Sequence, residues 1–126
     1  MMRIAFLGIG LMGLPMARRL CEAGFDTHVW NRTASKAEPL SAHGATLHAR
    51  ALDAVRGADA VVSILENGLI TEDVLFGQGV AAAMGKGALM IDMSSSKPRE
   101  ARDHAARLTA LGSSSRLPRL RRHGGR

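Results

Sequence analysis

The sequence has very little cysteine, few aromatic residues and no long apolar segment. Its one cysteine, Cys21, has no second cysteine in the chain to pair with. A single cysteine is compatible with a reducing compartment, so we expect a cytoplasmic protein. Tyrosine is absent, and the aromatic residues are three phenylalanines and one tryptophan. No apolar run approaches the roughly 18 residues that a membrane-spanning helix requires, which argues against a membrane protein.

Acidic residues are missing from the last 14 positions, whereas five arginines stand among residues 113–126. Residues 1–112 hold 12 Lys and Arg and 11 Asp and Glu. Most of the net charge of +6 therefore belongs to the C-terminal segment and not to a folded surface. The sequence predicts one folded domain over residues 1–112 and a basic, unstructured tail over 113–126. A nucleic-acid binder that uses this tail is a weaker alternative, because few aromatic side chains accompany the arginines.

Glycine, in contrast, is abundant, and three glycines near the amino terminus form the strongest motif. Residues 8–13 read G-I-G-L-M-G, which fits the pattern G-x-G-x-x-G. An apolar segment suited to a buried strand precedes them at residues 3–7, and a helical pattern follows at 15–23. A strand, a glycine turn and a helix in this order are the fingerprint of a dinucleotide-binding site. We therefore expect cofactor contacts from Gly8, Ile9, Gly10, Leu11, Met12 and Gly13.

Each glycine of this motif has a physical task. Gly8 permits the tight turn, Gly10 lets a pyrophosphate approach the backbone, and Gly13 lets the helix pack closely on the strand. The free N–H groups of the first helical turn then face the phosphates. The apolar run over residues 4–17 also resembles the core of a signal peptide, but its glycines and Pro15 make a poor continuous helix.

No acidic residue stands at the end of the second expected strand, residues 27–30, where an NAD-binding chain usually has Asp or Glu. Asn31 and Arg32 stand there instead. The planar guanidinium of Arg32 suits a 2′-phosphate, and Asn31 and Thr33 can add hydrogen bonds. The sequence therefore predicts a preference for NADP(H) over NAD(H). The alternative is that Arg32 is a solvated loop residue and that Thr33 only caps a helix over residues 34–42.

Helical and strand patterns alternate along the rest of the chain. We expect helices over residues 33–43, 52–56, 70–75, 80–84 and 96–111, and strands over 45–47, 60–65 and 89–92. This alternation predicts an α/β fold, a Rossmann-type doubly wound parallel sheet. Ligands bind such sheets beyond the carboxyl ends of the strands, so residues 8–13, 31–33, 65–68 and 93–96 should share one edge.

Three runs together resemble one enzyme family: G-I-G-L-M-G-L-P-M-A at 8–17, V-W-N-R-T at 29–33 and D-M-S-S-S-K-P at 92–98. The chain resembles the β-hydroxyacid dehydrogenases of the 3-hydroxyisobutyrate dehydrogenase and 2-hydroxy-3-oxopropionate reductase type. The resemblance covers about residues 2–112, the N-terminal NADP-binding domain of that family, without its all-α C-terminal domain. It implies an oxidoreductase that moves a hydride between nicotinamide and a small 3-hydroxy acid or semialdehyde, and the Asn-Arg-Thr form resembles the NADP-using branch.

The resemblance also implies roles for residues outside the glycine turn. Leu65 and Glu66 border the nicotinamide half of the cofactor, although Glu66 replaces the family's usual proline. Ser94 would contact substrate, and Ser95, usually a threonine, would contact cofactor; the alternative is that these serines only cap the following helix. The family's catalytic lysine lies beyond the end of this chain and Lys97 does not match it, so we expect no catalytic residue and no metal ligand here.

The family continues after residue 112 into a strand and a substrate-binding D-A-P-V-S-G-G turn, whereas residues 115–124 read S-R-L-P-R-L-R-R-H-G. These ten residues can be encoded so that reading one nucleotide later gives L-D-C-P-V-S-G-G-T, which is similar to that turn. We therefore expect that a frameshift near residue 113 ended the chain early. The chain would then bind NADP(H) with little turnover, and any oligomer would form through the missing domain. A second interpretation is a non-catalytic dinucleotide-binding module.

Overall fold

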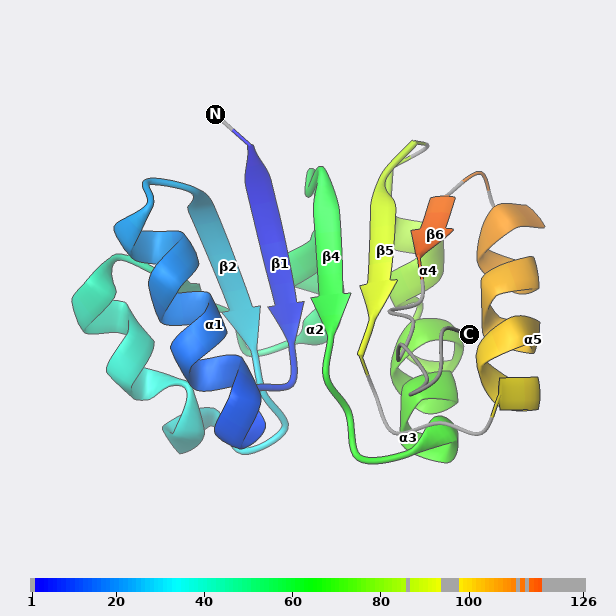
Figure 1. Cartoon of the computed structure of the whole chain (residues 1–126), viewed down its shortest axis with the longest axis horizontal. Helices are drawn as coiled ribbons and strands as arrows, with labels where there is room; N and C mark the ends of the chain where they lie inside the picture. The colour runs from blue at the N-terminus through cyan, green and yellow to red at the C-terminus, as the bar shows by residue number, and fades with distance from the viewer. Residues whose placement is uncertain (1, 86, 94–97, 111, 113, 117–126) are drawn as a thin grey trace, which may run out of the picture.

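A computed structural model describes residues 2–85, 87–93, 98–110, 112 and 114–116. Its centre is a six-stranded sheet in the order β3-β2-β1-β4-β5-β6, in which every neighbouring pair is parallel (Figure 1). The strands are β1 (Arg3–Leu7), β2 (Asp26–Trp30), β3 (Thr46–Leu47), β4 (Ala60–Ser63), β5 (Leu89–Asp92) and β6 (Ser114–Arg116). The expected α/β class and the Rossmann-type parallel sheet are confirmed.

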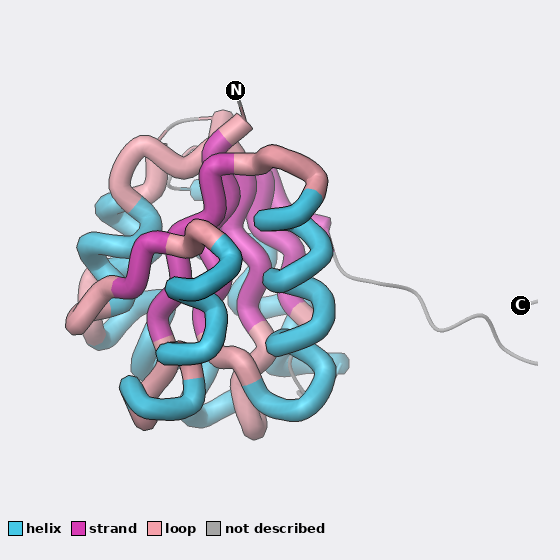
Figure 2. Tube along the Cα trace, turned by 90° about the vertical axis from the view of Figure 1, so that its left-hand side faces the viewer, coloured by secondary structure: helices cyan, strands magenta, loops and turns pink. Residues whose placement is uncertain are grey.

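Helices cover both faces of the sheet. They are α1 (Gly10–Glu22), the 3₁₀ helices η1 (Ala34–Lys36) and η2 (Glu38–His43), α2 (Ala51–Val55), α3 (Gly68–Glu72), the π-helical segment η3 (Asp73–Gly77), α4 (Val80–Ala83) and α5 (Pro98–Ala110). In Figure 1, α1 lies in front of the sheet, and α2 and α4 lie behind it. Figure 2 shows the strands between two helical layers. No helix among the described residues is long and apolar enough to cross a membrane.

The strands are buried on both faces, which explains their nearly continuous apolar sequence. In β1, Ile4 and Phe6 pack into the core under α1 and η2, whereas Ala5 and Leu7 pack into the core under α2 and α4. Successive side chains of a strand point to opposite faces, so one short apolar strand serves two cores.

The strand order reverses between β1 and β4, and this reversal creates the ligand edge of the sheet. Leu7, the last residue of β1, pairs with Trp30 of β2 and with Ser63 of β4. Because these three strands end at the same level, the loops that follow them must lie side by side.

Two expected helices differ from the structure. Helix α1 begins at Gly10 and not at Pro15, so the last glycines of the motif are already helical. The helix expected over residues 34–42 is instead the pair η1 and η2, with Pro39 near the start of η2. Proline has no N–H to donate to the carbonyl four residues earlier and its ring crowds that carbonyl, so Pro39 disfavours one continuous α-helix here, although α1 accommodates Pro15.

Two strands also differ from expectation. Strand β4 ends at Ser63, whereas the apolar pattern extends to residue 65, because Ile64 and Leu65 leave the sheet to line the ligand edge. The segment expected to be unstructured from residue 113 instead contributes β6, where Ser114, Ser115 and Arg116 pair with β5. Parallel pairing uses backbone groups that every non-proline residue supplies, so this strand needs no apolar sequence.

Candidate functional site

A groove of about 410 Å³ opens at the carboxyl ends of β1, β2 and β4. Its lining residues are Gly8, Ile9, Asn31, Arg32, Thr33, Lys36, Ile64, Leu65, Glu66 and Ile70. Seven of the residues that sequence reasoning selected are among them, although they come from three separate loops. The reversal of strand order therefore brings the motifs together as the parallel sheet predicts.

The floor of the groove is backbone, and the position of Gly8 admits no other residue without strain. Gly8 is buried with φ of +87°, a conformation that L side chains rarely adopt. A Cβ atom added there would overlap the carbonyl oxygen of Ile64. A Cβ at Gly13 would lie 3.2 Å from the carbonyl oxygen of Gly8, so helix α1 packs closely on the turn. Both observations agree with the tasks that the motif assigns to these two glycines.

Helix α1 starts directly from this turn. Gly10, Leu11 and Met12 occupy its first turn, where backbone N–H groups have no partner within a helix. The first turn carries no acidic residue, so nothing on the helix neutralises the positive end of its dipole. The Met12 side chain is 60% exposed and is not among the lining residues of the groove. Met12 can therefore contribute to the predicted site through its backbone N–H.

Asn31 connects the turn to the loop after β2. Its Oδ1 accepts a hydrogen bond from the backbone N–H of Ile9 at 2.9 Å. Its Nδ2 donates to the carbonyl oxygen of Thr33 at 2.8 Å. The Thr33 side chain makes no capping hydrogen bond to η1, so the alternative in which Thr33 caps a helix is not realised.

Two cations and one acid surround the groove. Arg32 is exposed just after β2, and the exposed Lys36 of η1 lines the same groove. The carboxylate of Glu66, in the loop after β4, is the acidic group of the lining. Arg32 also borders two neighbouring grooves, of about 460 and 330 Å³. The guanidinium is therefore accessible from several directions, as a residue that binds an anion should be.

Sequence reasoning missed three lining residues: Lys36, Ile64 and Ile70. Lys36 had a detectable signal, because it follows Thr33 by three residues and one turn of helix places it on the same side. The other two are ordinary apolar residues of a strand end and a helix, and only the fold brings them to the groove. The predicted contacts Ser94 and Ser95 lie outside the described residues.

A histidine in the 460 Å³ groove has a shifted pKa. His48 lines this groove beside Arg32, and its Nε2 lies 2.8 Å from Nδ1 of His28. Burial lowers the pKa of His48 below its ordinary value of 6.5, and the nearby His28 and Arg3 lower it further. This lowered pKa favours the neutral imidazole, although Asp53 opposes the shift, and Arg32 and Arg50 are the cations that line this groove.

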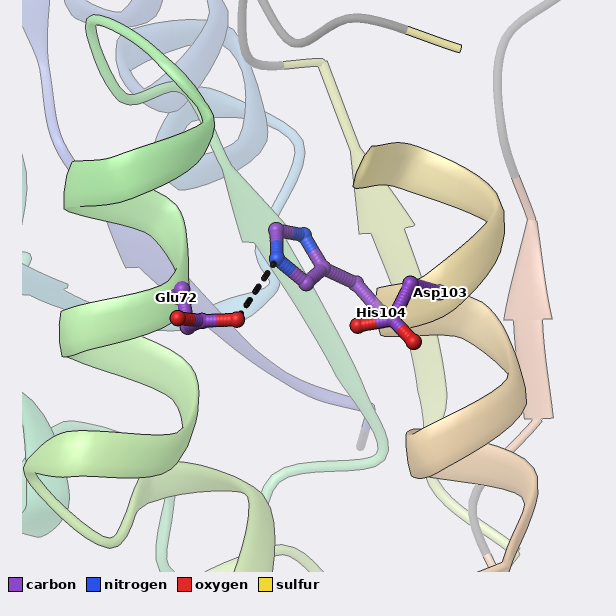
Figure 3. Close-up of side chains that lie close together, drawn as sticks. All are labelled: Glu72, Asp103 and His104. Atoms are coloured by element: carbon purple, nitrogen blue, oxygen red, sulfur yellow. Dashed lines mark ion pairs between the residues drawn. The ribbon is translucent and has the colours of Figure 1, made fainter. Parts of the chain in front are cut away.

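A second cluster of titratable groups lies away from the groove, between α3 and α5 (Figure 3). The ligand atoms of Glu72, Asp103 and His104 all lie within 4.8 Å of one another. Arg107, however, places its Nη1 atom 3.0 Å from Glu72 Oε1 and 3.7 Å from Asp103 Oδ2. The chain therefore supplies a cation to these carboxylates itself, which favours a structural link between helices over a metal site.

The groove can hold the phosphates of a dinucleotide. A glycine cradle that any Cβ would fill, the free N–H groups of a helix start and two cations are the groups that phosphate recognition uses. Glu66 does not suit an anion, so the side of the groove at β4 is less favourable for a phosphate than the side at β2. The groups suited to phosphate binding therefore gather around the ends of β1 and β2.

Comparison with known proteins agrees with this geometry. The family model described as the NAD binding domain of 6-phosphogluconate dehydrogenase matches residues 3–115. The chain is 36% identical over 113 residues to 3-sulfolactaldehyde reductase of Escherichia coli strain K12, which covers 89% of this chain and 38% of that protein. It is 40% identical over 112 residues to NAD-dependent L-serine dehydrogenase of Pseudomonas aeruginosa, covering 84% and 36%.

A solved structure extends the likeness to three dimensions. The chain superimposes on 3-hydroxyisobutyrate dehydrogenase of Mycobacterium tuberculosis with a TM-score of 0.88 and 32% identity, covering 99% of this chain and 42% of that one. The chain thus spans about two fifths of the length of the proteins that it matches. The relatives are dehydrogenases and reductases, and one of them is named for NAD, so the comparisons support a pyridine nucleotide without selecting its form.

Proposed function

Because the chain belongs to the family of the NAD-binding domain of 6-phosphogluconate dehydrogenase, with β-hydroxyacid dehydrogenase-type relatives, we propose that its groove binds NADP(H) in preference to NAD(H). The observation that carries this proposal is the position of Arg32 and Lys36 on the groove that holds the glycine turn. Strand β2 also ends without the acid that would bind a free 2′-hydroxyl. A charge-assisted hydrogen bond contributes roughly 1.5–3 kcal/mol, which corresponds to a tenfold to hundredfold preference.

Each part of the groove has a task in this proposal. The pyrophosphate lies over Gly8 and the first turn of α1, where only backbone N–H groups approach it. Arg32, Thr33 and Lys36 bind the 2′-phosphate. The nicotinamide half extends past the predicted residues Leu65 and Glu66, and the predicted residues Ser95 and Ser94 contact cofactor and substrate there.

We propose further that the chain supplies the cofactor half of an oxidoreductase. Bound nicotinamide would exchange a hydride with a small 3-hydroxy acid or semialdehyde. The relatives named above act on 3-sulfolactaldehyde, L-serine and 3-hydroxyisobutyrate, which are small molecules of this kind. The resemblance implies a catalytic lysine that matches no residue of these 126, because Lys97 is the last lysine and does not match it. We therefore expect the 126 residues by themselves to bind cofactor with little or no turnover. A cytoplasmic location belongs to the same proposal.

The test is a fluorescence titration of the whole chain with NADPH and with NADH. Arg32→Asp should weaken NADPH binding by roughly tenfold to a hundredfold, because a charge-assisted contact is replaced by repulsion, and should change NADH binding far less. Arg18→Asp is the control, because it changes the net charge equally on an exposed part of α1 outside the groove.

Two results would contradict the proposal. Undiminished NADPH affinity in Arg32→Asp would remove the 2′-phosphate preference, and no affinity for either dinucleotide in the wild-type chain would remove the binding function. The wild-type chain is then assayed for turnover of 3-sulfolactaldehyde, L-serine and 3-hydroxyisobutyrate, the compounds in the names of the relatives. Turnover well above a protein-free blank would show that the 126 residues are catalytically sufficient.

A further inference from the structure

The amide of Asn31 is bound at both ends by backbone from two different loops. The N–H of Ile9, in the turn after β1, donates to its Oδ1, and its Nδ2 donates to the carbonyl oxygen of Thr33, in the loop after β2. The two distances are 2.9 and 2.8 Å, and both atoms of the amide are oriented by these bonds. One side chain therefore bridges the two loops.

The backbone of the turn shows the same arrangement. The N–H of Gly8 donates to the carbonyl oxygen of Trp30 at 2.8 Å, directly before the bond from Ile9 to Asn31. The first two N–H groups of the turn thus point at the end of β2 and are not free for a ligand. The N–H groups free to meet a pyrophosphate begin in the first turn of α1, whose direction the Asn31 bond helps to set.

We propose that Asn31 is a positioning residue that couples the 2′-phosphate loop to the pyrophosphate turn. This proposal rests on the proposed function and replaces a direct contact of Asn31 with the cofactor by an action through Ile9 and Thr33. Neither partner holds its loop by a cap of its own, because neither Ile9 nor Thr33 makes a side-chain cap hydrogen bond. With Asn31 intact, the glycine turn is already at the distance from Arg32 that a bound dinucleotide requires.

The choice of asparagine follows from this double task. An aspartate could accept from the N–H of Ile9, but it could not donate to the carbonyl oxygen of Thr33. It would also place a negative charge beside a 2′-phosphate. Alanine would provide neither bond. Asparagine is the side chain of this length that satisfies both partners without adding charge.

A double-mutant cycle on NADPH affinity tests the coupling in the whole chain. Arg32→Ala should weaken NADPH binding by about tenfold or more in the wild-type background. In Asn31→Ala the same change should weaken binding by less than about threefold, because the loop that carries Arg32 is no longer held in register with the turn. The two factors would be equal if Asn31 acted on each loop independently.

Asn67→Ala is the matched control. Asn67 Oδ1 accepts from the N–H of Ile70 at 2.9 Å, so this variant also removes one bond between an asparagine and the backbone. Asn67 does not line the groove, and its loss is a stability effect at the start of α3. We expect Arg32→Ala to keep its full tenfold effect in the Asn67→Ala background.

A second variant keeps the test decisive if Asn31→Ala does not fold. Asn31→Asp retains the acceptor for Ile9, but it loses the donor to Thr33 and adds a negative charge, so NADPH affinity should fall and the further effect of Arg32→Ala should again shrink. An undiminished effect of Arg32→Ala in every folded Asn31 variant overturns the coupling while leaving NADP(H) binding intact. A wild-type chain that binds neither NADPH nor NADH overturns the proposed function instead.

Discussion

Gly8 is the residue on which the shape of the groove depends most directly. Its φ of +87° is one of several positive glycine angles, but its surroundings differ from the others. A Cβ at Gly8 would overlap the carbonyl oxygen of Ile64, whereas a Cβ at Gly24, with φ of +91°, would meet nothing within 4 Å. An alanine at Gly24 would therefore show the cost of backbone strain alone, whereas an alanine at Gly8 would add the cost of a Cβ atom for which there is no space.

Gly8→Ala should lower the free energy of unfolding more than Gly24→Ala does. Both variants carry the cost of an unfavourable φ, about 1–3 kcal/mol. Gly8→Ala adds the displacement of the Ile64 backbone, so we expect at least about 1 kcal/mol more and a loss of NADPH binding. Urea unfolding followed by NADPH titration measures both effects. Equal stability losses at the two positions would show that the space over Gly8 is not tightly limited.

Single residues also show how far the sequence could predict the site. Gly8, Arg32 and Glu66 were found because each stands in a motif or directly after an expected strand. The orientation of Asn31 could not be found, because its two partners are backbone atoms of loops whose spacing is set only in the folded chain. Lys36 was missed because it stands outside the motifs, although its spacing of three residues from Thr33 was a usable signal.

At the scale of elements, α5 contacts the rest of the fold in two ways, through apolar packing and through an ion pair. Leu108 is buried at 2% exposure in the core that also contains Met90 and Ala88. On its other side, Arg107 forms an ion pair with Glu72 of α3 and stacks 3.7 Å above the centre of the Phe76 ring. The side chains of Arg107 and Glu72 are 43% and 50% exposed.

Leu108→Ala should destabilise the domain far more than Glu72→Gln. Truncating a buried leucine costs about 2–5 kcal/mol, because apolar contacts are lost and a cavity remains. Exposed ion pairs contribute about 0–1 kcal/mol, so the loss of the Glu72 charge should lie within that range. The urea unfolding midpoints of the two variants, compared with that of the wild-type chain, show whether core packing or the ion pair contributes more to holding α5. A larger loss for Glu72→Gln would mean that the polar cluster, and not the core, holds α5.

The elements were more predictable than their ends. The alternation of buried strands and helices was visible in the sequence because parallel strands are apolar throughout and glycines separate them. The break between η1 and η2, just before Pro39, followed a local signal that outweighed the helical pattern around it. Strand β6 could not be predicted, because Ser114–Arg116 carry no apolar pattern and the edge of β5 recruits them through backbone hydrogen bonds.

The whole molecule separates its charge into two parts. Residues 1–112 are nearly neutral, and the two cations of the groove, Arg32 and Lys36, belong to this part. Residues 117–126 contain four of the five C-terminal arginines. Two kinds of anion could therefore bind the chain by independent means, a dinucleotide in the groove and a polyanion through the arginine-rich end.

Removing residues 117–126 should leave NADPH affinity within about twofold at physiological salt. The described residues that line the groove all lie between positions 8 and 70, so we expect the removed arginines to make no contact with a ligand there, and charges beyond a Debye length of about 8 Å are largely screened. Binding to nucleic acid, in contrast, depends on the number of phosphates neutralised, and its affinity falls with salt in proportion. The deletion should therefore abolish the salt-sensitive part of any DNA binding. Arg32→Asp, in contrast, should weaken NADPH binding and leave that DNA binding almost unchanged.

The contradicting result would be DNA affinity that persists in the shortened chain and competes with NADPH. It would place the polyanion in the groove, and the dinucleotide interpretation of the groove would then be wrong.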